Sequence, residues 1–231
     1  MSDALIRTES LIGTDKLEVL KSAHVAVFGI GGVGGYAVEA LARSGVGKLT
    51  LVDADVISCS NLNRQILATV SSVGQPKVDL AEQRIASVNP ECIVDKFQLF
   101  FNEETANEID FGAFDYVIDA IDVVSSKILL ITKCKEKDVP IVSCMGTGNR
   151  MVADFVITDV EKSKGCPLAR VMRKELKDRG IKGVDVLYSQ SAPYSSAVTA
   201  EHGRHAPASI CHVPAIAGMT LAGHVIGKLI K

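Results

Sequence analysis

The chain has 231 residues, of which 47% are hydrophobic and 23% charged, and its net charge at pH 7 is -2. This composition is sufficient for a sizeable core and excludes an intrinsically disordered chain. The near-neutral balance predicts no general attraction to nucleic acid, although it is compatible with a local basic patch. The length fits one large domain, or one domain with a small appendage.

The cysteines and the two ends of the chain bear on its location. Six cysteines occur without a Cys-x-x-Cys pair, which argues against a thiolate zinc site. The first ten residues, MSDALIRTES, lack the apolar core of a signal peptide. The apolar tail at 213–226 is too short for a convincing membrane span and predicts a buried helix. We therefore expect a cytoplasmic protein with free thiols, no zinc and no membrane partner.

Strand and helix signals alternate through the first 145 residues. A continuous apolar run at 24–30 predicts a strand buried on both faces, and helical spacing follows at 36–46. Further strands are expected at 48–55, 92–99, 115–122 and 139–145, with helices at 78–89 and 125–137. This alternation predicts an α/β fold with a Rossmann-like, doubly wound and mainly parallel sheet.

The remaining third of the chain predicts an extended, partly antiparallel C-terminal part. A strand and turn are expected at 150–160, an amphipathic helix at 166–180, and a loop rich in Ser, Pro and Gly at 190–209. We expect a single domain over residues 1–231. Its nucleotide-binding core would span about 20–150, and its substrate or dimer part about 151–231.

A glycine-rich turn, GIGGVGG at 29–35, lies between the first predicted strand and helix. Gly29, Gly31 and Gly34 match Gly-x-Gly-x-x-Gly, and Gly32 lies inside the turn, where backbone N–H groups can approach phosphate. Asp53 follows Gly34 by 19 residues and can accept hydrogen bonds from ribose hydroxyls. Taken alone, these residues favour a nicotinamide dehydrogenase; glycines used only for helix–strand packing are the plainer alternative.

The stretch DADVISCSNLNRQ at 53–65 changes that interpretation, because it places amides and a cation just behind two acids. A triphosphate needs several fixed positive groups and usually magnesium, whereas a dinucleotide needs few. Asp119 and Asp122 end a central strand, where an acid is a natural magnesium ligand. An ATP-consuming reaction fits this set better than hydride transfer, and the expected nucleotide contacts include Asp55, Asn61, Arg64, Gln65 and Lys77.

At these residues the chain resembles the superfamily of ubiquitin-activating-enzyme-like (ThiF-type) adenylating proteins. GIGGVGG, LVDADVISCSNLNRQ, VGQPK and DAID occur in the order and at the spacing of that superfamily, over roughly residues 5–160. The resemblance implies that Asp53 holds the ribose, that Asp122 binds Mg²⁺, and that Arg7 in RTESLIG reaches the triphosphate of the other protomer in a homodimer. It implies phosphate contacts from Asn61, Arg64, Gln65 and Lys77.

Within that superfamily the chain most resembles the tRNA threonylcarbamoyladenosine dehydratases. The signs include VFGIGGVGGYAVEALARSGVGKLTLVDAD, NRQI, VNPEC, YVIDAID, PLARVMRKELKDRGI and ASICHVPAIAGMTLAG. The resemblance implies ATP-dependent cyclisation of threonylcarbamoyladenosine at the tRNA anticodon loop through carboxylate adenylation. Arg7, Arg64, Lys77 and magnesium would neutralise the departing pyrophosphate. A monovalent cation and a sulfur-transfer protein are further expected partners.

Two other functions stay open from the sequence. One is adenylation of the C-terminus of a ubiquitin-like sulfur-carrier protein, although activators of that kind usually bear the paired cysteines that this chain lacks. The other, weaker, is a nicotinamide-binding dehydrogenase or a non-catalytic nucleotide-binding scaffold.

Several further residues allow a chemical and a plain structural interpretation. Cys166, at a predicted helix start, is a thioester or persulfide candidate, but a small packing residue is the better explanation. The basic helix at 170–182 is either a tRNA contact or a solvated face. The remaining candidates are the histidines, whose spacing matches no zinc motif, and four cysteines expected to pack: His202, His205, His212, His224, Cys59, Cys92, Cys134 and Cys144.

Overall fold

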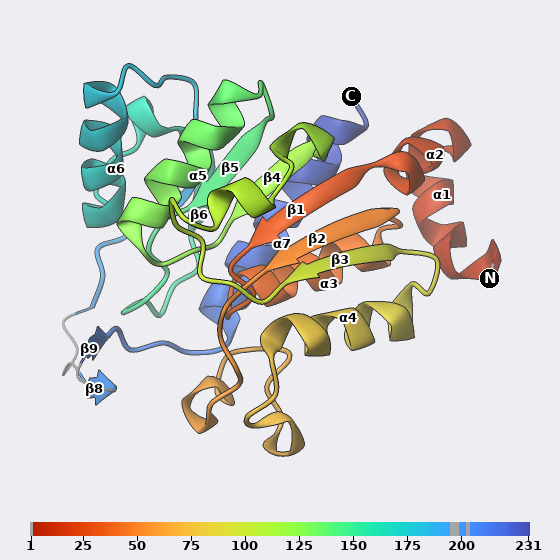
Figure 1. Cartoon of the computed structure of the whole chain (residues 1–231), viewed down its shortest axis with the longest axis horizontal. Coiled ribbons are helices and arrows are strands. Elements are labelled where there is room, and N and C mark those ends of the chain that lie inside the picture. The colour runs from red at the N-terminus through yellow and green to blue at the C-terminus, as the bar shows by residue number, and fades with distance from the viewer. Residues whose placement is uncertain (1, 195–198, 202–203) are drawn as a thin grey trace.

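The computed structural model describes residues 2–194, 199–201 and 204–231. Its centre is a seven-stranded sheet in the order β3-β2-β1-β4-β5-β7-β6 (Figure 1). Every neighbouring pair is parallel except β6 with β7, which confirms the predicted doubly wound sheet with an antiparallel C-terminal part. The strands are β1 (His24–Phe28), β2 (Lys48–Val52), β3 (Ile93–Phe97), β4 (Tyr116–Asp119), β5 (Ile141–Cys144), β6 (Phe155–Asp159) and β7 (Asp185–Ser189).

The inner strands are continuous apolar runs because helices cover both of their faces. All five residues of β1 are buried, as are all four residues of β4 and of β5. The chain passes from β1 outward to β2 and β3, and then returns to β4 on the other side of β1. In open α/β sheets this reversal of strand order leaves a crevice at the carboxyl ends of the strands, where ligands bind.

Helices form a layer on each face of the sheet (Figure 1). The side chains of α3, α4 and α7 pack with the sheet in one apolar cluster, and those of α5 and α6 pack in a second cluster on the opposite face. The helices are α3 (Gly34–Arg43), α4 (Lys77–Val88), α5 (Val124–Glu136), α6 (Pro167–Asp178) and α7 (His212–Leu229).

Two helices that the sequence pattern did not predict, α1 (Ile6–Ile12) and α2 (Thr14–Ser22), lie at the amino ends of the strands (Figure 1). The backbone N–H of Gly47, just before β2, donates to the carbonyl of Leu20 at 3.0 Å. A Cβ atom on Gly47 would lie 1.7 Å from the carbonyl oxygen of Lys21, so only glycine permits this approach. The N-terminal helices are thus attached at the amino ends of the strands, opposite the carboxyl ends where ligands bind in sheets of this kind.

The C-terminal part departs from its prediction inside the expected loop at 190–209. There, β8 (Thr199–Glu201) pairs antiparallel with β9 (Arg204–Ala206). Strands of three residues are too short to show a two-residue period, which is why the pattern did not reveal them. The tail forms α7 as predicted, and no helix in the described ranges combines the length and apolar character needed to cross a bilayer.

Candidate functional site

The glycine turn joins β1 to α3 and lies beside β4 at the carboxyl edge of the sheet, the side at which the parallel strands end. Gly29 has a φ of 85°, and a Cβ atom there would lie 2.6 Å from the carbonyl oxygen of Ala120. A Cβ atom on Gly34 would lie 1.8 Å from the carbonyl oxygen of Gly29. These two glycines therefore fix the close packing of strand and helix, which is one of the alternatives weighed from the sequence.

The other two glycines of the turn face neighbouring side chains. A Cβ atom on Gly31 would lie 3.7 Å from Nε2 of Gln65, and one on Gly32 would lie 3.3 Å from Cβ of Pro214 in α7. The first turn of α3 has no side-chain cap and no acidic residue. The partial positive charge of this helix N-terminus suits an anion such as phosphate.

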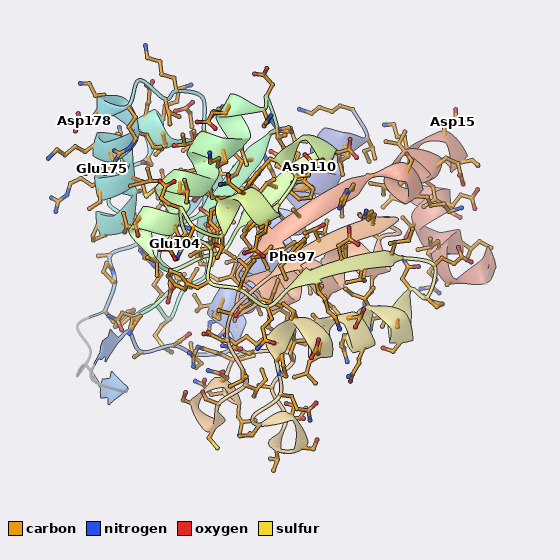
Figure 2. The ribbon with its side chains drawn as sticks, viewed as in Figure 1. Asp15, Phe97, Glu104, Asp110, Glu175 and Asp178 are labelled. Carbon is orange, nitrogen blue, oxygen red and sulfur yellow. The ribbon has the colours of Figure 1, made fainter. Side chains whose placement is uncertain are left out.

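Asp53 follows β2 directly and points back toward the glycine turn. Its Oδ2 accepts a hydrogen bond from the backbone N–H of Ile30 at 2.6 Å, and its Oδ1 accepts one from the N–H of Asp55 at 2.8 Å. Its own N–H donates to the carbonyl of Phe97 at the end of β3, the residue labelled in Figure 2. Burial raises the pKa of this carboxyl group, although Lys77 and the two N–H donors oppose that rise.

Lys77 is the first residue of α4 and brings a buried ammonium group to the same place. Its Nζ lies 2.6 Å from Oδ2 of Asp55 and 3.7 Å from Oδ1 of Asp53. Its side chain is 6% exposed, whereas that of Asp55 is 69% exposed. Asp55 therefore anchors Lys77 beside the predicted ribose acid, and the structure brings these three residues together as the sequence predicted.

The segment between β2 and α4 presents the predicted amide and guanidinium groups. The carbonyl of Asn61 accepts hydrogen bonds from the backbone N–H groups of Arg64 and Gln65, at 3.1 and 3.0 Å. The side-chain oxygen of Asn61 also accepts one from the N–H of Ser58 at 3.1 Å. Asn61 therefore shapes the turn that carries the next two residues, a role that the sequence motif did not reveal.

Gln65 and Arg64 point differently from this turn. The Gln65 side chain is buried, and its Oε1 has no hydrogen-bond partner in the described part of the chain. An unpaired buried acceptor beside the glycine turn suits a ligand that donates a hydrogen bond. The Arg64 guanidinium is half-buried and donates through Nη1 to the carbonyl of Ser60 and to Oδ1 of Asn63.

The two acids that follow β4 have different surroundings. Asp119, its last residue, is fully buried; it pairs with Lys127 of α5 at 2.9 Å and accepts a hydrogen bond from Ser143 at 2.5 Å. Asp122 is exposed and has no hydrogen bond or ion pair within the described ranges. Only Asp122 is therefore available to a metal ion. Lys127 was not among the residues predicted from the sequence, where the only signal was a lone lysine in the helical run SSKILL.

Arg7 is the one predicted site residue that this chain does not bring to the others. It lies on α1, exposed to solvent. A Cβ atom on Gly45, before β2, would lie 2.9 Å from the Leu5 side chain, so α1 is held at the amino edge of the sheet. Arg7 therefore lies apart from the other predicted site residues, and its role in the site of a second protomer stays a prediction.

The cysteines and histidines do not form a site in the described residues, where no group of three or more metal-ligating side chains occurs. His202 lies outside the described residues, as does the side chain of His205. Cys166 is buried in the α5–α6 cluster, as the packing explanation expects. Cys134 and Cys144 are also buried, but Cys59 is exposed in a short 3₁₀ turn, so its prediction as a packing residue was wrong.

A cavity of about 760 Å³ lies elsewhere, between α5 and α6. Val124, Ile128, Val171 and Ile181 line it together with charged residues at its rim. None of the predicted nucleotide contacts lines this cavity. The carboxyl edge, and not this cavity, therefore combines a glycine turn, two cations, a buried acid and an orphaned acceptor.

Known proteins resemble this chain over nearly its whole length. The ThiF family model matches residues 4–231. The chain is 43% identical to the tRNA threonylcarbamoyladenosine dehydratase of Bacillus subtilis, over 97% of this chain and 94% of that relative. The crystal structure of the Escherichia coli tRNA N6-threonylcarbamoyladenosine dehydratase with AMP has a TM-score of 0.88 at 35% identity, covering 96% of this chain and 92% of that chain. With ATP bound, the E. coli enzyme gives a TM-score of 0.86 at 33% identity, covering 98% and 93%.

Proposed function

The chain belongs to the ThiF family, and we propose that it is an ATP-dependent tRNA threonylcarbamoyladenosine dehydratase. The observation that supports this most is the likeness, over nearly the whole chain, to dehydratases of that name, one of which holds AMP or ATP in its crystals. The cluster at the carboxyl edge of the sheet gives such a nucleotide a place to bind in this chain.

The nucleotide is assigned to the crevice between the glycine turn and the segment after β2. Asp53 accepts hydrogen bonds from the ribose hydroxyls, and the N-terminus of α3 faces phosphate. Arg64 and Lys77 lie beside them as the fixed cations for the triphosphate. The orphaned Oε1 of Gln65 supports this assignment, because a ribose hydroxyl or the adenine amino group of a nucleotide can donate to it.

Asp122 is the proposed ligand of a magnesium ion. Its exposed carboxylate follows β4 and stands free of protein partners in the described residues. Magnesium is held by one or two carboxylates together with substrate phosphates, so a single available acid beside a triphosphate fits that ion. When bound, magnesium would neutralise part of the charge that develops on the departing pyrophosphate.

The reaction begins with a carboxylate, which is a poor electrophile. An oxygen of the threonylcarbamoyl carboxylate attacks the α-phosphorus of ATP, forming an acyl-adenylate and releasing pyrophosphate. Arg64 and Lys77 stabilise the negative charge that gathers on the leaving group. A nitrogen of the substrate then attacks the activated carbonyl carbon, loses its proton, and expels AMP. The balance is ring closure with the loss of one water, whose oxygen departs in AMP.

Ring closure within the substrate needs no protein nucleophile. Burial of the Cys166 side chain supports this, because a thiol that forms a thioester must reach the acyl group.

A homodimer is the proposed assembly, with Arg7 acting in the partner's site. Two observations support it. Arg7 lies at the amino edge of its own sheet. The same helix also exposes two large apolar side chains, with Ile6 55% and Leu11 85% exposed. A second chain that covered this helix would remove these two side chains from water, which would favour association.

The tRNA is proposed to contact α6. Arg170, Lys174 and Lys177 recur at intervals of four and three, so they share one exposed face of this helix. No acidic partner lies within ion-pair distance of these three cations in the described residues. The opposite side, which includes Glu175, faces the α5–α6 cavity; Figure 2 labels Glu175 and Asp178 on α6.

The basic face of α6 begins beside the active-site edge. A Cβ atom on Gly165, just before the helix, would lie 3.5 Å from the carbonyl oxygen of Gln190, which follows the carboxyl end of β7. A nucleic acid bound along this face would therefore extend toward the proposed nucleotide crevice. Unpaired cations supply the phosphate contacts that dominate binding to nucleic acid.

The test is a reaction of purified protein with tRNA that carries threonylcarbamoyladenosine, in the presence of ATP and magnesium. The digested tRNA is then examined by mass spectrometry. We expect a modified adenosine lighter by one water, formed only when ATP is present. An unchanged nucleoside would overturn the proposal. Pyrophosphate exchange that requires a carrier protein ending in Gly-Gly, and not tRNA, would assign the chain to the carrier-activating alternative.

A further inference from the structure

A fully buried ion pair lies beneath the loop that carries Asp122. Lys127 and Asp119 are both 0% exposed, and Nζ of Lys127 lies 2.9 Å from Oδ2 of Asp119. Ser143 donates to the same Oδ2 at 2.5 Å. The remaining bonds of the pair go to one residue: Oδ1 of Asp119 accepts the N–H of Ile121 at 3.1 Å, and Nζ of Lys127 donates to its carbonyl at 2.9 Å.

Stability alone does not explain this pair. Taking two charges out of water costs several kcal/mol per ion, and replacing a buried ion pair with apolar residues is often neutral or stabilising. What an apolar pair cannot do is hold the N–H and the carbonyl of Ile121 at the same time. The specific effect of the pair is thus a fixed conformation of the loop at 120–123.

That loop also touches the glycine turn. The N–H of Ala120 donates to the carbonyl of Phe28 at 2.8 Å, and the carbonyl oxygen of Ala120 occupies the space where a Cβ atom of Gly29 would lie. Asp122 follows Ile121 directly. A shift of Ile121 would therefore change the separation between Asp122 and the turn that receives the phosphates.

We propose that Lys127 is a positioning residue for the metal–nucleotide complex, acting with Asp119 through the backbone of Ile121 on the carboxylate of Asp122. The inference rests on the proposed function, in which Asp122 holds magnesium. The Lys127 side chain is fully buried, so it sets the place of Asp122 without touching the nucleotide. Removal of groups that orient metal ligands typically lowers metal affinity about 10- to 100-fold.

The test compares folded variants by their binding of Mn²⁺, measured by electron paramagnetic resonance with the non-reacting analogue α,β-methylene ATP. Lys127→Met alone leaves a buried, unpaired Asp119, so it is combined with Asp119→Asn, which keeps the acceptor for Ile121. We expect the double variant to melt near the wild-type temperature and to bind Mn²⁺ about 10- to 100-fold more weakly. Its binding of AMP without metal should stay close to wild type.

The matched control is Glu39→Gln combined with Arg84→Met, which removes an ion pair between α3 and α4, away from this loop. It should leave Mn²⁺ affinity unchanged. Asp122→Ala separates the two levels of the argument. If it binds Mn²⁺ normally, the magnesium assignment fails and the inference fails with it. If Asp122→Ala loses affinity while the folded double variant does not, the inference alone is wrong.

Should the double variant fail to fold, Ser143→Ala supplies the measurement, because it removes only one hydroxyl from the Asp119 carboxylate. It should weaken Mn²⁺ binding in the same direction and to a smaller degree. A folded Ser143→Ala protein with wild-type Mn²⁺ affinity would overturn the inference.

Discussion

The two ends of the same sheet differ in the charges that they bury. At the carboxyl end, the side chains of Asp119 and Lys127 are 0% exposed, and that of Lys77 is 6% exposed. At the amino end, Asp185 pairs with His224 and Lys228, at 3.1 and 3.3 Å, while all three side chains keep contact with water. Exposed pairs contribute little to stability, and buried ones are costly to form. The fold therefore accepts the cost of buried charge at the end where we propose nucleotide binding.

Gly34, at the carboxyl end of the sheet, and Gly47, at its amino end, provide the strongest test of this comparison. At each of them two backbone segments approach closely. An alanine Cβ at position 34 would lie 1.8 Å from a carbonyl oxygen of Gly29, and one at position 47 would lie 1.7 Å from that of Lys21. A clash with a backbone atom cannot be relieved by a change of side-chain rotamer. We expect Gly34→Ala and Gly47→Ala each to lower the free energy of unfolding by about 3 kcal/mol or more, measured by urea denaturation.

The two variants should differ in function. At a temperature where both are folded, Gly47→Ala should keep its affinity for ATP, whereas Gly34→Ala should lose it. Gly223→Ala is the control, because a Cβ atom there meets open space on α7 and alanine favours helix by up to about 1 kcal/mol. Equal loss of ATP binding in both edge variants would remove the distinction between the two ends.

Arg64→Ala is expected to reduce pyrophosphate release about a hundredfold, equivalent to about 3 kcal/mol of transition-state stabilisation. Its thermal stability should barely change, because the protein bonds of the guanidinium are those to Ser60 and Asn63 in its own turn. The matched control is Lys21→Ala, which also removes one cation, but from α2 at the amino edge. It should release pyrophosphate at the wild-type rate. A wild-type rate of pyrophosphate release in Arg64→Ala would remove Arg64 from the site.

Loss of one cation from the basic face of α6 should weaken tRNA binding severalfold and make it less sensitive to salt. For Lys174→Ala, the slope of log affinity against log salt concentration should fall by about one, as expected for one lost phosphate contact. Arg179→Ala, on the cavity side of the same helix and paired with Glu175, is the control. ATP affinity should be unchanged in both. Identical slopes for the two variants would exclude this face from the tRNA contact.

The smallest effects should appear in the pH dependence of stability, with opposite signs at the two ends. Burial raises the pKa of Asp53 above 3.8, so its contribution to folding is largest at low pH and is lost as the pH rises through the folded pKa. Burial lowers the pKa of His224 below 6.5, although Asp185 opposes this and Lys228 and Lys231 assist it. Its contribution is present above pH 6.5 and is lost as the pH falls through the folded pKa.

Denaturation of wild type, Asp53→Asn and His224→Gln between about pH 7.5 and about pH 3.5 measures both contributions, because this range extends below the ordinary Asp53 pKa of 3.8. On acidification the wild type should gain stability relative to Asp53→Asn and lose it relative to His224→Gln. The His224 effect should stay under about 1 kcal/mol, because the imidazole is partly solvated. Differences that move in the same direction would contradict the assigned causes.

The sequence allowed the prediction of features that depend on local pattern. Apolar runs and glycine positions predicted the parallel strands, and the motif around Asp53 predicted which polar groups meet at the carboxyl edge. Interactions between distant segments were beyond its reach. Lys127 looks like an ordinary helix residue until β4 and β5 place Asp119 and Ser143 beside it.

The elements that the sequence pattern did not predict likewise depend on contacts that form only in the folded chain. Helices α1 and α2 are short and exposed along much of their length. They are held by the Leu5 and Leu17 side chains at Gly45 and by backbone contacts at Gly47, rather than by a broad apolar face. The β8–β9 hairpin consists of three-residue strands in a segment rich in turn-forming residues. Asn61 was predicted to contact phosphate, but its hydrogen bonds to Ser58, Arg64 and Gln65 are visible only once the turn is folded.

The most direct test of the central claim follows the oxygen that leaves as the substrate cyclises. tRNA is prepared with ¹⁸O in the carboxylate of its threonylcarbamoyladenosine and is reacted with ATP in unlabelled water. If the carboxyl edge activates that carboxylate by adenylation, AMP will carry one ¹⁸O atom, and one AMP will form for each ring closed. Unlabelled AMP, or the formation of ADP and phosphate instead, would contradict the account.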